Sequence, residues 1–294
     1  MLPDKLPTAF VPLILPHAMV PIDVLPLFPV LDAKLLELLR SLAPADWQRP
    51  TLARQWAVKD VAAHLLDGSL RTLSMLRDGH FAEVPEDASY DGLVAFLNRL
   101  NADWVGATRR LSPEVLISLL EQSGAEYSAF LNTLDPWAPA AFAVAWAGEE
   151  ESLNWFHVAR EYTEKWHHQQ QIREAVGHAT ELLTPELFRP FIDTLMRGLP
   201  HALRAVPAPL GAVVHVRVTT QSGGTWQVEQ TSAGWQLRPP APGHPAEAEV
   251  AMPPEVAWKL FTKGLSPAAA LPHVQLLGDE VLGTAVLHLV AMMA

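Results

Sequence analysis

The spacing of hydrophobic residues changes within this 294-residue chain, and the change limits the folds that the chain can adopt. From Val30 to Gly177, hydrophobic residues recur every three to four positions, which is the spacing of amphipathic helices. From Val214 onward, short runs alternate hydrophobic and polar residues, which is the spacing of half-buried strands. A chain of this length is more readily built on two cores than on one. We therefore predict a multidomain fold, an all-α part followed by a smaller α+β part.

Start and stop signals divide the first part into several helices. Pro113 after Ser112 is typical of a helix start, whereas Gly79 and Gly177 are typical of helix ends. Together with the hydrophobic spacing, these signals predict helices over residues 30–42, 57–77, 91–110, 113–134 and 152–176. We expect residues 30–180 to form a bundle of four or five antiparallel helices.

The second part, residues 184–294, combines helices with short strands. Two alternating runs flank Gly223-Gly224 and predict a β-hairpin. The predicted strands cover residues 214–218, 226–229, 235–238 and 247–252, and the predicted helices cover 184–205, 254–264 and 279–293. The boundary between the two parts is expected between Gly177 and Thr184.

Residues 1–29 are expected to form an extended arm that lies over hydrophobic surface. The stretch from Ala9 to Leu31 is hydrophobic, but its five prolines would break a membrane-spanning helix repeatedly. A signal peptide also fits poorly, because Asp4 and Lys5 precede no unbroken hydrophobic core. We expect a cytoplasmic protein that does not enter the membrane.

Charge and cysteine content exclude some functions. The net charge of −11 repels phosphate backbones and anionic lipid surfaces, so we expect no nucleic-acid partner. The chain has no cysteine, so it offers neither a thiolate metal ligand nor a cysteine nucleophile. Any thiol chemistry needs a thiol from outside. The oligomeric state stays open.

Two helices carry polar stripes that could bind a metal. On the helix ending at Gly177, the spacing of 4, 3 and 4 residues puts four side chains on one face, namely His157, Glu161, Glu164 and His168. His64 shares a second stripe with Asp60, Asp67 and Arg71 on a largely hydrophobic helix. Each stripe fits either a solvated helix face or the lining of a polar site, and periodicity does not choose between them.

Two motifs about a hundred residues apart resemble a known family. The string from Trp56 to Leu65 resembles the Trp-x-x-x-Asp-x-x-x-His-Leu signature of the mycothiol-dependent maleylpyruvate isomerase and DinB-like families. Glu164, His168 and Gln171 resemble the second signature, Glu-x-x-x-His-x-x-(Asp or Gln). The resemblance implies a DinB-like four-helix bundle followed by a sterol-carrier-like α+β domain.

The same resemblance implies a set of site residues. His64, Glu164 and His168 would be the metal ligands, with Zn²⁺ the first choice and Fe²⁺, Mn²⁺ and Ni²⁺ also compatible. Asp60 would accept the proton of the non-ligating nitrogen of His64. Arg71 is the best candidate to hold an anionic substrate. The neighbour of His168, His167, is expected at the surface.

The function that the resemblance implies is a thiol-dependent isomerase or S-transferase. A low-molecular-weight thiol such as mycothiol or bacillithiol would act on a small electrophilic substrate at the metal. Two alternatives stay open: a metal-dependent hydrolase that activates water, and a non-catalytic protein that binds metal and a hydrophobic ligand.

Overall fold

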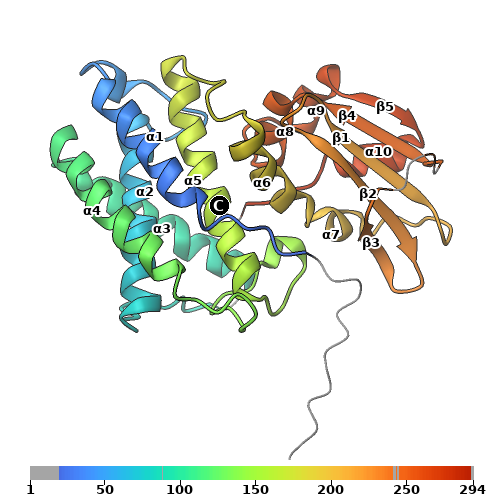
Figure 1. Cartoon of the computed structure of the whole chain (residues 1–294), viewed down its shortest axis with the longest axis horizontal. Coiled ribbons are helices and arrows are strands. Elements are labelled where there is room, and N and C mark those ends of the chain that lie inside the picture. Colours follow the sequence, from blue (N-terminus) through green and yellow to red (C-terminus); the bar gives the residue numbers. More distant parts are fainter. Residues whose placement is uncertain (1–19, 88, 241–242, 244, 293–294) are drawn as a thin grey trace, which may run out of the picture.

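The computed structural model describes residues 20–87, 89–240, 243 and 245–292. A helical half and a mixed half lie side by side, with the strands confined to the C-terminal half (Figure 1). This architecture confirms the predicted fold class, a helical bundle followed by a smaller α+β part. The boundary between the two parts stays a prediction.

Five long helices form the N-terminal half: α1 (Leu27–Ser41), α2 (Val58–Thr72), α3 (Tyr90–Thr108), α4 (Pro113–Leu131) and α5 (Asn154–Val176). The helix α2 lies at the centre, because it contacts α3, α4 and α5, and it continues into a π-helical turn over Leu73–Arg77. The helix α5 ends at Gly177, whose φ of 87° is left-handed and lets its N–H cap the final turn of the helix.

The first helix begins earlier than predicted. Residues 27–29 were expected to be extended, but α1 starts at Leu27. Pro26 is its N-cap and Pro29 lies in its first turn, where a missing backbone N–H breaks no helical hydrogen bond. Residues 1–19 of the predicted arm lie outside the described residues.

In the C-terminal half, the described residues form a five-stranded sheet of order β3-β2-β1-β4-β5, in which β1 and β4 pair in parallel and the other neighbours pair antiparallel. Its strands are β1 (Val213–Val218), β2 (Gly224–Thr231), β3 (Gly234–Arg238), β4 (Ala248–Met252) and β5 (Gln275–Gly278). Its helices are α6 (Pro185–Met196), α7 (Leu199–Leu203), α8 (Pro254–Phe261), α9 (Pro267–Ala270) and α10 (Glu280–Val286). The sequence did not predict β5 or α9, and the single helix predicted over residues 184–205 is divided into α6 and α7.

One hydrophobic cluster runs through both halves. Trp166 of α5 stacks on Phe191 of α6, with ring centroids 4.0 Å apart, and lies 6.1 Å from the ring of Trp258 in α8. The same cluster continues into the inward residues of the sheet, such as Val216 and Val250. A second cluster lies within the bundle, between α1, α2 and α4. The two halves are therefore packed together by core residues.

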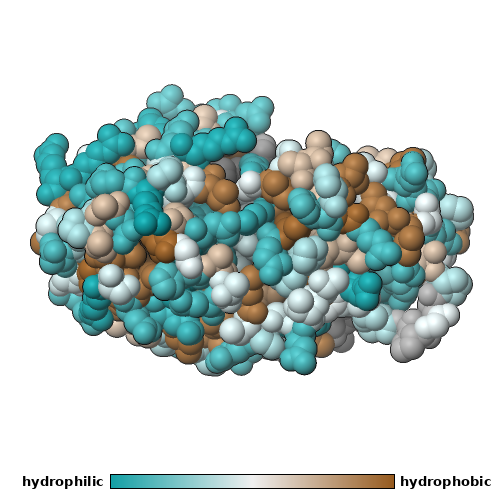
Figure 2. All heavy atoms as spheres, turned by 90° about the horizontal axis from the view of Figure 1, so that it is seen from above, coloured by the Kyte–Doolittle hydropathy of each residue, from teal (hydrophilic) through white to brown (hydrophobic). Residues whose placement is uncertain are grey.

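Most of the face shown in Figure 2 is hydrophilic, with hydrophobic residues in patches between polar ones. Among the described residues, no helix combines the length and the hydrophobicity needed to cross a membrane.

Candidate metal site

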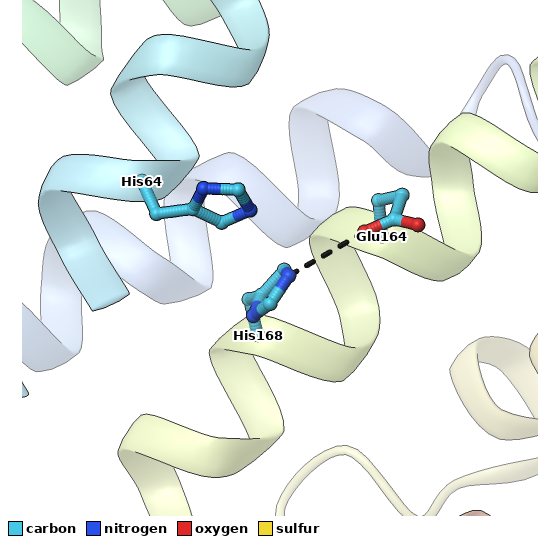
Figure 3. Close-up of side chains that lie close together, drawn as sticks. All are labelled: His64, Glu164 and His168. Carbon is cyan, nitrogen blue, oxygen red and sulfur yellow. Dashed lines mark ion pairs between the residues drawn. The ribbon is translucent and has the colours of Figure 1, made fainter. Parts of the chain in front are cut away.

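The helices α2 and α5 bring the three predicted metal ligands together. His64 comes from the second turn of α2, while Glu164 and His168 lie one turn apart on α5 (Figure 3). One nitrogen or oxygen atom from each of the three lies within 4.8 Å of the others. Two imidazoles and one carboxylate are a donor set that suits a divalent cation such as Zn²⁺. The geometry of the three side chains therefore fits the predicted metal.

Contacts within the site hold the rings close to one another. The rings of His64 and His168 have centroids 4.5 Å apart, and His168 Nε2 lies 3.4 Å from Glu164 Oε2. The indole of Trp56 covers one side, 4.9 Å from the ring of His64 and 6.4 Å from that of His168. The Glu164 side chain is 38% exposed, so the site is open to solvent on its side.

Burial keeps His64 in the form that binds a metal. Burial lowers the pKa of His64 well below its ordinary value, and the nearby His168 and Arg71 lower it further. His64 is therefore neutral at pH 7, and a neutral imidazole offers a lone pair to a cation.

The side chain of Gln171 fixes the tautomer of His168. His168 Nδ1 lies 3.0 Å from Gln171 Oε1, which can only accept a hydrogen bond. The proton of a neutral His168 is therefore on Nδ1, and its Nε2 is left bare on the side of Glu164. The sequence matched Gln171 to a motif position but assigned no role to it.

Asp60 does not have the predicted contact. Its Oδ2 accepts a hydrogen bond from the N–H of Ala57 at 3.1 Å, and its Oδ1 lies 3.9 Å from Arg109 Nε. His64 Nδ1 is buried and has no hydrogen-bond partner among the residues that the structure describes. Asp60 lies in the first turn of α2, where a carboxylate caps the free backbone N–H groups, and this local contact takes the place of one to His64.

Arg71 lies on the last turn of α2, two turns beyond His64. Its Nη1 is buried and lies 3.5 Å from Asp67 Oδ2, and within the described part of the chain it has no hydrogen-bond partner. Its charge lowers the pKa of both His64 and Glu161, so Arg71, a member of the α2 stripe, also lies near the α5 stripe. A guanidinium with an unused donor beside the candidate metal ligands can bind an anionic group.

The remaining members of the α5 stripe, His157 and Glu161, lie in a largely buried polar network, so this part of the face is not solvated. Burial raises the pKa of Glu161, but the charges of Arg160, His157 and Arg71 and the hydrogen bond from Tyr127 together outweigh burial, so the pKa is lowered. Glu161 accepts hydrogen bonds from Tyr127 at 2.7 Å and from Arg160 at 2.5 Å. His157 is only 2% exposed, and Arg160 donates to its Nδ1. Tyr127 was missed by sequence reasoning because it lies on α4, outside both stripes.

His167 is not at the surface as predicted, because only 4% of it is exposed. It lies about 100° around α5 from His168, on the side that the C-terminal half covers. Its ring centroid is 6.3 Å from that of Trp258. The prediction treated the bundle alone, and the covering helix α8 comes from far along the sequence.

Part of the chain is similar in sequence to a known protein family. Residues 28–173 match the family model described as the mycothiol maleylpyruvate isomerase N-terminal domain. No curated protein sequence matches the chain.

Solved structures match along both halves. A histidine-to-alanine mutant of the mycothiol-dependent maleylpyruvate isomerase has a TM-score of 0.51 and 13% identity, covering 87% of this chain and 93% of that chain. A second crystal structure of that enzyme has a TM-score of 0.50 and 14% identity, and the match covers 82% of this chain and 88% of that chain. A sterol carrier protein 2-like protein from Aedes aegypti covers 34% of this chain and 95% of its own, with 20% identity and a TM-score of 0.26.

At these identities the two isomerase structures show a shared fold. The family model adds a match in sequence over the helices that carry His64, Glu164 and His168. The resemblance expected from the two motifs is thereby confirmed: residues 28–173 match the family of mycothiol maleylpyruvate isomerase N-terminal domains, and the fold is that of the maleylpyruvate isomerase structures.

Proposed function

We propose that this protein holds a divalent cation at His64, Glu164 and His168 and uses it in a thiol-dependent isomerase or S-transferase reaction. The observation that carries the proposal is the convergence of these three side chains within 4.8 Å, inside a domain of the maleylpyruvate isomerase family. Zn²⁺ is the first choice of metal for two imidazoles and one carboxylate, and Fe²⁺, Mn²⁺ or Ni²⁺ can replace it.

The thiol must come from outside, because the chain has no cysteine. A bound divalent cation supplies the positive charge that keeps such a thiol in its thiolate form, which is the nucleophilic one. A low-molecular-weight thiol such as mycothiol or bacillithiol fits this role, since the solved relatives are named for their dependence on mycothiol. The reaction is then isomerisation about an activated double bond, or transfer of the thiol to an electrophile.

The chain's own residues prepare the site for this chemistry. Neutral His64 and the Nδ1-protonated His168 present lone pairs, and Glu164 adds a negative charge that balances part of the cation's charge. Arg71 holds the anionic group of the substrate, because its buried Nη1 has a donor to spare. The indole of Trp56 limits the access of water from its side of the two imidazoles.

A thiol titration tests this function. Protein loaded with Co²⁺ should develop sulfur-to-metal charge-transfer absorption with at least one of mycothiol, bacillithiol, coenzyme A and glutathione. The same thiol should support turnover of an electrophile such as maleylpyruvate or a haloarene. Both signals should vanish in Glu164→Ala and persist in His178→Ala, a matched change to a half-exposed residue just beyond α5.

Failure of this test would favour one of the alternatives. Metal-dependent turnover without any thiol would support a hydrolase. Bound metal without thiol binding or turnover, with lipid that co-purifies, would support a binding protein.

A further inference from the structure

A series of side-chain hydrogen bonds joins His168 to His167, which lies about 100° around α5 and has its ring centroid 4.5 Å from that of His168. His168 Nδ1 bonds to Gln171 Oε1 at 3.0 Å, and Gln171 Nε2 bonds to His167 Nε2 at 2.9 Å. All three side chains are buried, with 8%, 5% and 4% of each residue exposed for His168, Gln171 and His167. Solvent therefore does not compete for these hydrogen bonds, and the series of bonds is a specific feature of the folded protein.

The chemistry of the amide fixes the direction of each bond. The amide nitrogen of Gln171 can only donate, so His167 Nε2 must accept and the proton of neutral His167 is on Nδ1. The amide oxygen then faces His168 and can only accept. With the Gln171 amide in this orientation, its Oε1 accepting from His168 and its Nε2 donating to His167, the His168 proton is on Nδ1 and Nε2 is free for a cation.

The C-terminal half covers these hydrogen bonds on the side of His167. Trp258 of α8 is 1% exposed, and its ring centroid lies 6.3 Å from that of His167. The next residue, Lys259, forms an ion pair with Glu174, which is two turns along α5 from His167. The helix α8 therefore covers α5 at the level of His167 and shields the hydrogen bonds from water.

We propose that Gln171 and His167 are positioning residues for the metal ligand His168, and that Trp258 keeps them in place from the C-terminal half. Metal affinity in the bundle then depends on a helix that contributes no ligand. This proposal rests on the metal site proposed above, but the orientation of His168 is testable without a metal.

The first test reads the histidine tautomers of the metal-free, full-length protein by ¹⁵N NMR. In the wild type, both His168 and His167 should be protonated on Nδ1. Gln171→Leu should release His168 from this single tautomer. Gln171→Glu should restore it, because a carboxylate also accepts from His168 Nδ1. Gln170→Leu is the matched control, since Gln170 is buried next in sequence but bonds to the carbonyl of Ala179.

The second test measures Zn²⁺ affinity of the same variants by competition with a chelating dye. Loss of a hydrogen bond behind a ligating histidine weakens metal binding by roughly 10- to 100-fold, which is the fall expected for Gln171→Leu. Gln171→Glu should recover most of the affinity, and Gln170→Leu should lose little. Trp258→Leu should weaken binding. Trp235→Leu is the control and should not weaken it, because Trp235 is also buried in the C-terminal half but donates its hydrogen bond to the carbonyl of Val206.

The outcomes separate this inference from the proposed function. If the wild type binds no Zn²⁺, the metal site is wrong, while the tautomer measurement still decides whether Gln171 positions His168. The inference is overturned if His168 is protonated on Nε2 in the metal-free wild type. It is also overturned if Gln170→Leu and Trp235→Leu weaken Zn²⁺ binding as much as Gln171→Leu and Trp258→Leu.

Discussion

His157 is a buried histidine whose neutral form the fold requires. Arg160 donates a hydrogen bond to Nδ1 of His157, and burial lowers the pKa of His157 to about 4. In the unfolded chain its pKa returns to about 6.5, so the unfolded state binds one more proton between pH 6.5 and 4. Stability is therefore lost as the pH falls through this window, by about 2 kcal/mol at pH 5.

The variant His157→Gln should remove this part of the pH dependence, because glutamine keeps an acceptor for Arg160 and does not titrate. Urea unfolding at pH 7.5 and pH 5 measures the effect. His178→Gln, at a half-exposed position, is the control and should behave as the wild type. An equal loss of stability at pH 5 in His157→Gln and wild type would show that another group is responsible.

Arg71 is expected to act on substrate binding. Replacement by leucine removes a charge-assisted hydrogen bond, which contributes about 1.5–3 kcal/mol, so kcat/KM should fall by roughly 10- to 100-fold, mainly through KM. Lysine should restore little of this, because it lacks the planar fork of donors. The control is Arg99→Leu, since Arg99 is exposed and paired with Glu83 and Asp103. An unchanged KM in Arg71→Leu would remove Arg71 from the site.

At the scale of the helices, replacement of Asp60 distinguishes a role in capping α2 from a role in the metal site. Asp60→Ala removes the hydrogen bond to Ala57 N–H and should destabilise the protein by about 1 kcal/mol in chemical denaturation. Zn²⁺ affinity should stay close to the wild-type value, because Asp60 makes its hydrogen bond to Ala57 and none to His64 Nδ1. A tenfold loss of affinity with unchanged stability would instead support the role that the sequence predicted.

The helices of the site were predictable because their periodicity is strong. Both α2 and α5 were placed to within a few residues, and the core face of α5, including Tyr162 and Trp166, is buried as expected. The four-residue strand β5 was not predictable, since its adjacent Leu276 and Leu277 show no alternation. The start of α1 was missed because prolines were taken to end helices, although the first turn tolerates them.

Residues that act across helices were harder to predict than residues within one. Spacing alone placed His157, Glu161, Glu164 and His168 on one face of α5, but it could not tell a solvated face from a buried one. The burial of His167 depends on Trp258, about ninety positions later in the sequence. Such a contact has no local signal.

For the whole molecule, the shared hydrophobic cluster predicts that the two halves unfold together. Phe191 is fully buried where α6 meets Trp166 of α5. Phe191→Ala should therefore destabilise the protein by about 3–5 kcal/mol, and calorimetry should still show one transition. Helical circular dichroism and tryptophan fluorescence should shift to the same lower temperature. Two separate transitions, with the bundle unaffected, would contradict a shared core.

The central claim is that His64, Glu164 and His168 bind one divalent cation, and metal content after equilibrium dialysis against Zn²⁺ tests it most directly. Elemental mass spectrometry of the full-length protein should find one zinc per chain in the wild type and in His178→Ala. It should find little in His64→Ala, Glu164→Ala or His168→Ala, each of which should remain folded by circular dichroism. Full zinc occupancy in all three variants, or none in the wild type, would contradict the account.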